Sequence, residues 1–304
     1  MSAAAAPRRD PRALDHVIGR FARAAAAPWL HQEVARRMAE RLAVIRQPPR
    51  NWLDWWGFTG GGAAAVAAVW PRAQRFVAEP TAALLARSRD ALRAPWWALA
   101  RRDDARRVLA VDAVPAAGVQ MVWANMMLHW VADEAATIAR WQRALAPQGW
   151  LMFSTLGPQT LRELREIHAD AGWPAPHAPF TDMHDLGDLL VHAGFADPVM
   201  DQETLTLTWS SAAAALVELR ALGGNASADR GAGLRTPRWR ERLCAALQAR
   251  ADGQGRIALR FEIVYGHAVK GLPRPVDGET RIPVASLRGS RRSRRSAPDS
   301  SPLE

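Results

Sequence analysis

Acids, glycines and one amide follow the short apolar segments in the first half of the chain. The set consists of Asp54, Gly57, Gly60, Glu79, Asp112 and Asn125. An acid about 20 residues beyond a glycine-rich turn is placed to accept hydrogen bonds from ribose hydroxyls, and Glu79 follows Gly60 by nineteen residues. Asp112 suits an amino group such as N6 of adenine, and glycines allow a ligand to approach the backbone closely. The set therefore predicts a site for a nucleoside-type cofactor, with Asn125 above the reacting atoms.

These residues meet only if the apolar segments before them are neighbouring strands of one sheet. The apolar segments are 52–54, 75–79, 107–111, 119–124 and 150–154, and segments of helical spacing at 63–69, 84–92 and 135–145 alternate with them. Such alternation is typical of a parallel sheet with right-handed crossovers. In a doubly wound sheet, ligands bind beyond the carboxyl ends of the strands. We therefore expect an α/β fold, Rossmann-like, with a doubly wound and mostly parallel sheet.

Further elements are expected at both ends of this pattern. Residues 12–42 carry apolar positions at helical spacing with a break at Pro28, and predict two N-terminal helices. Later strands are predicted at 203–208 and 257–266, at least one of them an antiparallel edge strand, and later helices at 160–168, 183–193, 212–222 and 238–249. The predicted organisation is N-terminal helices in 1–46, a main domain in 47–271 and a disordered basic tail in 272–304, where Pro, Ser and Arg accumulate.

Charge and composition exclude several classes of protein. The chain has 40 basic and 30 acidic residues, a net charge of +10, and every basic residue except Lys270 is arginine. The arginines form no stripe of the kind that binds DNA, so no nucleic acid is expected. The single cysteine, Cys244, excludes a disulfide framework and cysteine-based metal sites, and no metal is expected. Two uncharged stretches, 55–71 and 113–132, are too interrupted by glycine, proline and polar residues to span a membrane, so we expect a cytoplasmic protein.

Several longer stretches carry a resemblance to a known family. They are 122–125 with 128–130, 145–157 (LAPQGWLMFSTLG), 160–165 (TLRELR), 182–200 (DMHDLGDLLVHAGFADPVM), 218–225 (ELRALGGN) and 264–267 (VYGH). Together with weaker similarity before them, they span about 21–271. This pattern resembles the class I S-adenosylmethionine (SAM) methyltransferases, and within them the malonyl-[acyl-carrier protein] O-methyltransferase family of biotin synthesis. The stretch from Phe153 to Met200 is the most specific to that family.

The resemblance implies a location for the cofactor. SAM would lie across the strand ends, with Glu79 on its ribose, Asp112 near its adenine, and Gly57 and Gly60 near its methionine part. The N-terminal helices would form a lid over the active site.

The resemblance also implies a reaction, methyl transfer to the free carboxyl of a malonyl thioester of acyl-carrier protein or CoA. A carboxylate is ionised at neutral pH because its pKa is about 4, so this nucleophile needs alignment rather than a general base. An arginine should hold the carboxylate; Arg162 and Arg165 are candidates, and His129 is a third candidate for the active site. The basic run at 291–295 is suited to an acidic partner such as an acyl-carrier protein.

The first glycine motif differs from the family's pattern, which is Asp-x-Gly-x-Gly-x-Gly. This chain reads DWWGFTG from Asp54 to Gly60, so that Trp56 and Phe58 stand where two glycines belong. Rings at these positions would fill the part of the site meant for the methionine end of SAM. Two alternatives therefore stay open: a catalytically silent methyltransferase-fold protein that binds a partner, and a methyltransferase with a different acceptor.

Overall fold

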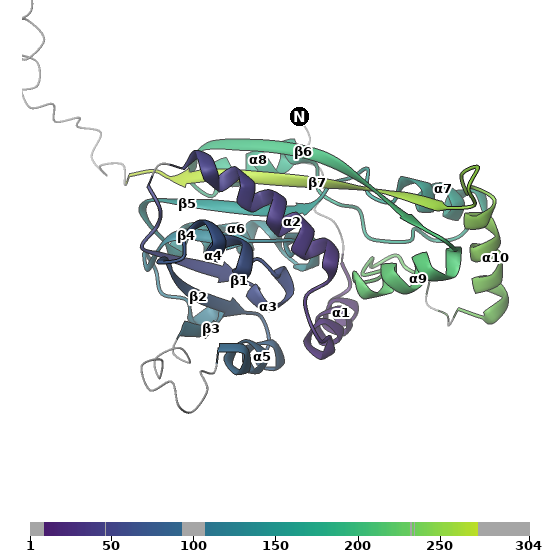
Figure 1. The fold of residues 1–304 in the computed structure, drawn as a ribbon, viewed down its shortest axis with the longest axis horizontal. Helices are drawn as coiled ribbons and strands as arrows, with labels where there is room; N and C mark the ends of the chain where they lie inside the picture. Colours follow the sequence, from purple (N-terminus) through teal and green to yellow (C-terminus); the bar gives the residue numbers. More distant parts are fainter. Residues whose placement is uncertain (1–8, 46, 93–106, 232, 234, 273–304) are drawn as a thin grey trace, which may run out of the picture. The chain divides into compact units, whose positions relative to one another are not determined.

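A single mixed sheet organises the part of the chain that the structure, a computed structural model, describes: residues 9–45, 47–92, 107–231, 233 and 235–272. Its strand order is β3-β2-β1-β4-β5-β7-β6 (Figure 1). The strands are β1 (Asn51–Trp55), β2 (Gln74–Glu79), β3 (Val108–Ala110), β4 (Val119–Ala124), β5 (Leu145–Leu156), β6 (Phe195–Trp209) and β7 (Ile257–Lys270).

The directions of the strands confirm a doubly wound, mostly parallel sheet. The pairs β1–β2, β2–β3, β1–β4 and β4–β5 are all parallel. Strand β7 runs antiparallel to both of its neighbours, β5 and β6. The late strands thus supply the expected antiparallel pairing, although the reversed strand β7 lies one place in from the edge and β6 forms the edge itself.

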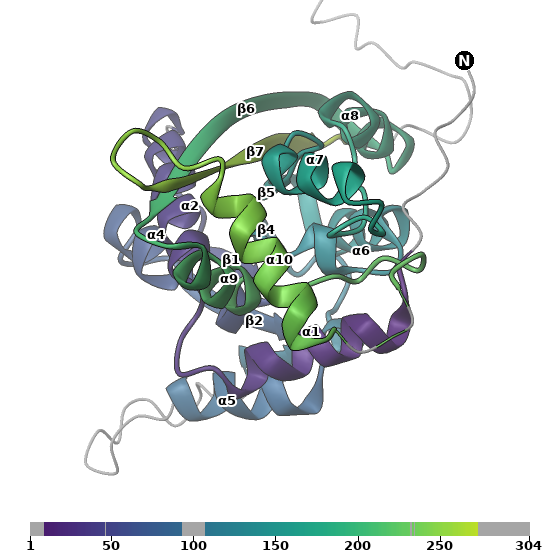
Figure 2. The same cartoon turned by 90° about the vertical axis from the view of Figure 1, so that its right-hand side faces the viewer.

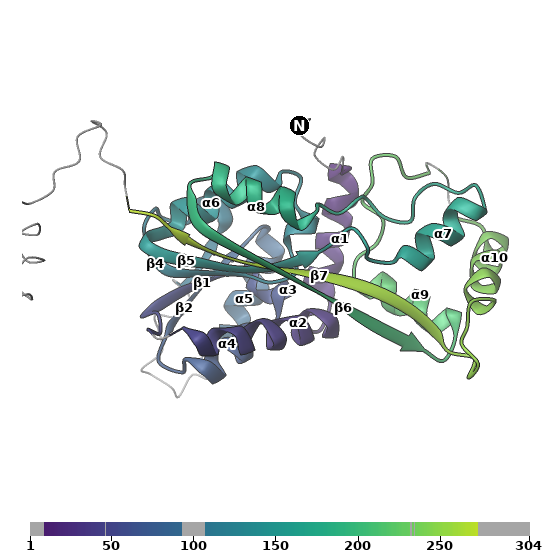
Figure 3. The ribbon, with the colours of Figure 1, turned by 90° about the horizontal axis from the view of Figure 1, so that it is seen from above.

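Helices cover both faces of the sheet. They are α1 (Pro11–Arg23), α2 (Trp29–Glu40), α3 (Gly57–Gly60), α4 (Ala63–Val69), α5 (Ala82–Leu92), α6 (Glu134–Ala144), α7 (Arg162–Asp170), α8 (Met183–His192), α9 (Ala212–Ala221) and α10 (Pro237–Gln248), with short 3₁₀ turns η1 (Arg41–Val44), η4 (Val111–Ala113) and η5 (Leu128–Trp130). Figure 3 shows α2 and α4 on one face and α6 and α8 on the other, and each face has its own buried apolar cluster.

The two N-terminal helices form as predicted, separated at Pro28. Helix α1 begins at a strong start signal, because the Asp10 carboxylate accepts from the backbone N–H groups of Arg12 and Ala13 and a proline follows it. One face of α1 is buried through residues such as Leu14 and Phe21. Helix α1 therefore precedes the sheet in the sequence. It packs at the carboxyl ends of the parallel strands, beside α5 (Figure 2).

Strands β6 and β7 are longer than the sequence predicts. The expected strand at 203–208 is part of β6, which begins at Phe195, because Pro198 falls in a register shift between Ala196 and Val199 where no ladder hydrogen bond is needed. Figure 1 shows this pair of strands extending beyond the parallel strands, with α7, α9 and α10 around its far end. That extension brings α9 and α10 to the same end of the molecule as the carboxyl ends of the parallel strands.

The described residues up to Gly271 form one compact unit. Residues 273–304, which include nearly all of the predicted basic tail and the arginine run at 291–295, lie outside the described residues. Within the described ranges, no helix combines the length and apolar character that crossing a bilayer requires.

Candidate functional site

A cavity of about 410 Å³ lies at the carboxyl ends of the parallel strands. Its walls include Leu14 and Ile18 of α1, Trp55 and Trp56 at the end of β1, Pro80 after β2, Asp112 after β3 and Trp130 of η5. This is the edge of the sheet at which doubly wound folds bind ligands. The cavity is therefore the candidate cofactor site, and α1 forms one of its walls.

Glu79 is the last residue of β2 and directly precedes Pro80 in the cavity wall. Its carboxylate is buried, and Oε1 accepts hydrogen bonds from the Phe58 backbone N–H (2.8 Å) and the Ser88 hydroxyl (2.6 Å). Burial raises the pKa of Glu79 to about 8, against the opposing effect of those two hydrogen bonds. The second oxygen, Oε2, has no partner among the described residues. A buried oxygen without a partner is costly, and a ligand hydroxyl would satisfy it.

Asp112 lies at the rim of the same cavity, in the turn η4. Its side chain is exposed and pairs with Arg140, whose Nη2 lies 3.1 Å from Oδ1. The expected strand before it is shorter than predicted and ends at Ala110. Asp112 is thus accessible to a ligand in the cavity, and an amino group would compete there with Arg140.

Asp54 lies beneath the turn that follows β1. Its side chain is fully buried, and Oδ2 accepts from Arg75 Nη2 at 2.6 Å. Burial raises the pKa of Asp54, and the Arg75 charge opposes this shift. A Cβ atom on Gly57 would lie 2.8 Å from the Asp54 carboxyl carbon, so this glycine makes room for the carboxylate. The cavity lining includes neither Asp54 nor Gly57, and it does not include Glu79 either. The second oxygen of Asp54, Oδ1, has no partner among the described residues.

Asn125 and Gly60 also contact one another. The Asn125 amide donates to the carbonyl oxygens of Gly60 (2.6 Å) and His31 (2.7 Å), and its oxygen accepts from the Ser154 hydroxyl (2.7 Å). A Cβ atom on Gly60 would lie 3.3 Å from the Asn125 carbonyl oxygen. The side chain of Asn125 therefore ties the turn after β1 to α2 and β5, with its polar atoms already occupied.

The two aromatic residues of the first motif lie in different places. Trp56 adopts a left-handed backbone conformation (φ 57°), which is rare for a bulky residue, and its buried indole forms part of the cavity wall. The next residues form the helical turn α3 rather than an open glycine turn. Phe58 is half-buried, with the Arg87 guanidinium 4.7 Å from its ring centroid. The indole of Trp56 thus lines the cavity without filling it, and the ring of Phe58 lies outside the lining.

The three catalytic candidates do not lie together. His129, in η5, is buried, and its Nδ1 lies 3.1 Å from the Thr155 hydroxyl of β5. Burial, followed by the charges of His31 and Arg9, lowers the pKa of His129 well below its usual value. His129 is therefore neutral at pH 7 and offers no charge to a carboxylate.

The arginine candidates are on α7, outside the cavity lining. Arg162 is exposed and pairs with Glu166 one turn further along its own helix (2.9 Å). Arg165 is half-buried, and its buried Nε has no partner among the described residues. The described structure does not bring either arginine to the cavity.

A buried ion pair that the sequence did not indicate clamps the start of α1. Arg9 Nη2 lies 2.6 Å from Glu134 Oε1, and Arg9 Nη1 donates to the carbonyl oxygen of Val131 in the cavity wall (2.9 Å). The Thr181 hydroxyl donates to the other oxygen of Glu134 (2.6 Å). The Asp10–Pro11 start signal indicates where α1 begins, but only the tertiary structure reveals what holds it beside the cavity.

In the described ranges, no group of three or more His, Cys, Asp or Glu side chains is arranged to hold a metal ion. His184 lies next to Asp182, which caps α8 by accepting from the His184 backbone N–H. These two residues thus have a local structural explanation.

Comparison with known proteins places the chain in a family. A family model described as a methyltransferase domain matches residues 28–197. Two proteins named malonyl-[acyl-carrier protein] O-methyltransferase, from Gallionella capsiferriformans and Laribacter hongkongensis, are 39% and 40% identical to this chain. Each alignment covers 84% of this chain, and they cover 90% and 89% of the respective relatives.

Solved structures share the fold at low sequence identity. The YcgJ protein of Bacillus subtilis is 11% identical with a TM-score of 0.50, over 79% of this chain and 99% of that chain. A candidate methyltransferase from Bacillus halodurans C-125 is 15% identical with a TM-score of 0.50, over 78% of this chain and 99% of that chain. The chain therefore has the fold of the class I SAM-dependent methyltransferases and belongs to the malonyl-[acyl-carrier protein] O-methyltransferase family.

Proposed function

We propose that this protein transfers the methyl group of SAM to the free carboxyl of a malonyl thioester carried by acyl-carrier protein, a step of biotin synthesis. The observation that carries the proposal is the similarity, at 39% and 40% identity over most of the chain, to relatives with that name. The cavity at the carboxyl ends of the strands supports it, because it lies where the fold binds a nucleoside.

The nucleoside half of SAM fits the residues around the cavity. The unpartnered Oε2 of Glu79 would accept from a ribose hydroxyl, and Asp112 at the rim would face the adenine amino group. Trp56 and Trp130 would flank the nucleoside. Asp54 and Asn125 would act indirectly, by holding the turn after β1 in place. When bound, SAM supplies an electrophilic methyl group on its sulfonium.

The acceptor needs little acid–base help from the chain. A malonyl carboxylate is already ionised at pH 7 because the pKa of such a group is about 4. The task of the protein is to align the carboxylate oxygen with the methyl carbon and to exclude water. The α1 wall, clamped by Arg9 and Glu134, would serve the second purpose as a lid.

Incubating the purified protein with SAM and malonyl-carrier protein tests the proposal. We expect the carrier protein to gain the mass of one methylene group, as a methyl ester that leaves together with the acyl group when hydroxylamine cleaves the thioester. Acetyl-carrier protein, which lacks a free carboxyl, should stay unmodified. Methylation of the acetyl form, or of side chains on the carrier protein, would indicate a different acceptor. An unchanged mass with both forms, in a protein that binds SAM, would contradict the proposed reaction.

The wall position of Trp56 favours a second candidate, a silent methyltransferase-fold protein, because its indole stands where the family has a glycine. The two candidates differ in whether the cavity takes a nucleoside. Binding of S-adenosylhomocysteine to the wild type and to Glu79→Ala separates them.

A further inference from the structure

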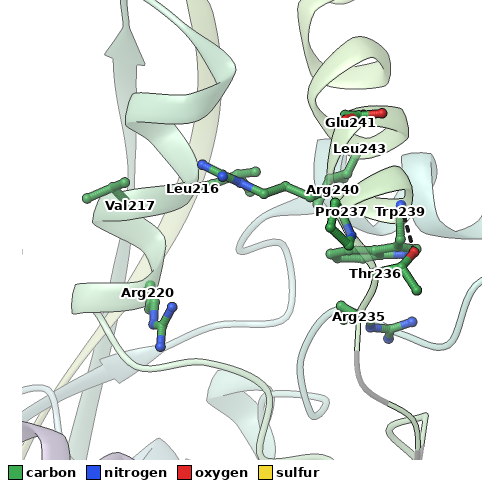
Figure 4. Close-up of a pocket in the computed structure, with 10 residues that line it drawn as sticks. All are labelled: Leu216, Val217, Arg220, Arg235, Thr236, Pro237, Trp239, Arg240, Glu241 and Leu243. Carbon is green, nitrogen blue, oxygen red and sulfur yellow. Dashed lines mark hydrogen bonds between the residues drawn. The ribbon is translucent and has the colours of Figure 1, made fainter.

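A second hollow, a groove of about 600 Å³, lies between α9 and α10, apart from the cofactor cavity (Figure 4). Three arginines line it: Arg220 on α9, Arg235 just before α10, and Arg240 on α10. Leu216 and Trp239 contribute apolar surface, and Glu241 is the acid in the lining. Figure 4 shows Glu241 at the far end of the groove from Arg220 and Arg235. The groove therefore presents a cluster of positive charge beside an apolar surface.

The charges of these arginines are not neutralised by the described part of the protein. Among the described residues, none of the three arginines forms an ion pair with an acid, whereas Arg36, Arg37 and others elsewhere do. Arg235 instead lies over the ring of Trp239, with its guanidinium carbon 4.5 Å from the ring centroid. An aromatic face orients a guanidinium and leaves its N–H donors available for an oxyanion.

The groove adjoins the cofactor cavity through the end of α9. Gly223, which follows α9, packs so closely on Trp130 that a Cβ atom would lie 2.1 Å from the indole. Trp130 is part of the cavity wall. Arg20 of α1 lies beside the same turn, since a Cβ atom on Gly224 would be 3.0 Å from Arg20 Nη2. Burial, followed by the charge of Arg220, lowers the pKa of Arg20. Cations thus continue from the groove towards the helix that covers the cavity, and their mutual repulsion would be relieved by a bound acidic surface.

We propose that the groove between α9 and α10 docks the carrier protein, through an acidic helix that pairs with Arg220, Arg235 and Arg240. The proposal rests on the proposed function, since it names where the partner of that reaction binds. Acyl-carrier proteins are acidic, which matches the positive groove, and charge complementarity of this kind sets the orientation and rate of association. From this groove, the thioester arm of the carrier would reach the cavity past Trp130. Figure 2 looks onto this end of the molecule and shows α9 and α10 in front of the sheet.

Charge reversal tests the groove directly. The double variant Arg220→Glu/Arg240→Glu is compared with Arg72→Glu/Arg143→Glu, a control with two exposed arginines that precede β2 and β5 at the other end of the strands. Calorimetry with the holo-carrier protein should give a Kd at least about tenfold higher for the groove variant and within twofold for the control. The KM for malonyl-carrier protein should rise likewise, while kcat and the rate with malonyl-pantetheine, which has no acidic protein attached, stay unchanged.

The outcomes separate the docking site from the reaction. If the groove variant binds the holo-carrier protein as tightly as the wild type does, or if the control loses affinity equally, the docking proposal is wrong. If the wild type methylates neither malonyl thioester, the proposed reaction fails, and the two calorimetric comparisons still decide the docking site. Equal loss of activity with malonyl-pantetheine would indicate a damaged active site and would also count against docking.

Discussion

Replacing Glu79 with alanine should raise the Kd for S-adenosylhomocysteine by about 10- to 100-fold, because a hydrogen bond to a charged group contributes about 1.5–3 kcal/mol. The free Oε2 atom is the acceptor that the ribose would use, and the two hydrogen bonds to Oε1 hold the carboxylate in position. Calorimetry with the wild type and the variant measures the effect. Arg72→Ala, a change at an exposed residue away from the cavity, serves as the control and should leave the Kd unchanged.

The pH dependence of the same binding should be distinctive. With a pKa of about 8 in the free protein, Glu79 is mostly protonated at pH 7, and ribose hydroxyls donate best to the ionised form. Binding therefore releases a proton, so that the Kd should fall about tenfold per pH unit between pH 6 and 8 and then level off. Calorimetry in buffers of different ionisation enthalpy measures the released proton. Glu79→Gln should bind weakly with little pH dependence.

The free energy of unfolding should also depend on the protonation of Glu79, and it should decrease as the pH rises. The folded chain retains the Glu79 proton up to about pH 8, whereas an unfolded glutamate loses it at a pKa of about 4.3. The free energy of unfolding should therefore contain a contribution that declines as pH rises between these values and is absent in Glu79→Gln.

If the wild type shows no heat and no thermal stabilisation with millimolar S-adenosylhomocysteine, the cavity takes no nucleoside and the silent alternative is correct. Wild-type affinity in Glu79→Ala would instead place the ribose elsewhere.

The strands and helices were largely predictable because their hydrophobic periods are local. Residues 63–69 and 119–124 form α4 and β4 with the predicted bounds. The errors occur where local signals mislead. Pro147, Gln148 and Gly149 indicate a turn before β5, yet β5 begins at Leu145 and includes them. Gln148 has a positive φ there, and the ladder with β4 shifts register. A bulge thus absorbs the turn-forming residues within a strand.

A cavity lies at the edge of the sheet that the sequence indicates, but its lining includes only one of the predicted cofactor residues, Asp112. Pro80 after β2 and Asp112 after β3 line one cavity, because parallel strands end at a common edge, and Glu79 lies buried directly before Pro80. Asp54, near the end of β1, and Asn125, just after β4, lie at this edge too, yet their side chains form hydrogen bonds inside the protein. Side-chain direction depends on strand register and on the conformation of the following turn, and both are tertiary properties. The α1 wall depends on contacts between distant residues, which local patterns do not contain.

Removing Arg75 should destabilise the protein strongly, because it leaves the Asp54 carboxylate buried without its partner. Breaking a buried pair in this way costs about 3 kcal/mol, and Asp54 is fully buried whereas Arg75 is partly exposed. We therefore expect Arg75→Gln to lower the free energy of unfolding by about 3 kcal/mol, measured by urea denaturation. The loss should be larger at pH 8 than at pH 5, since burial raises the pKa of Asp54 and protonation relieves the unpaired charge.

The double variant Asp54→Asn/Arg75→Gln controls this prediction, because it removes both charges and should recover most of the lost stability. A double variant as unstable as Arg75→Gln alone would show that the ion pair is not the cause.

Cofactor binding should distinguish the roles of Asp54 and Glu79. Since the Asp54 carboxylate is held by Arg75, Asp54→Asn should change the Kd for S-adenosylhomocysteine only a few-fold, whereas Glu79→Ala should raise it by about 10- to 100-fold. In this chain, then, the acid of the first motif would stabilise the turn, and the acid at the end of β2 would hold the cofactor.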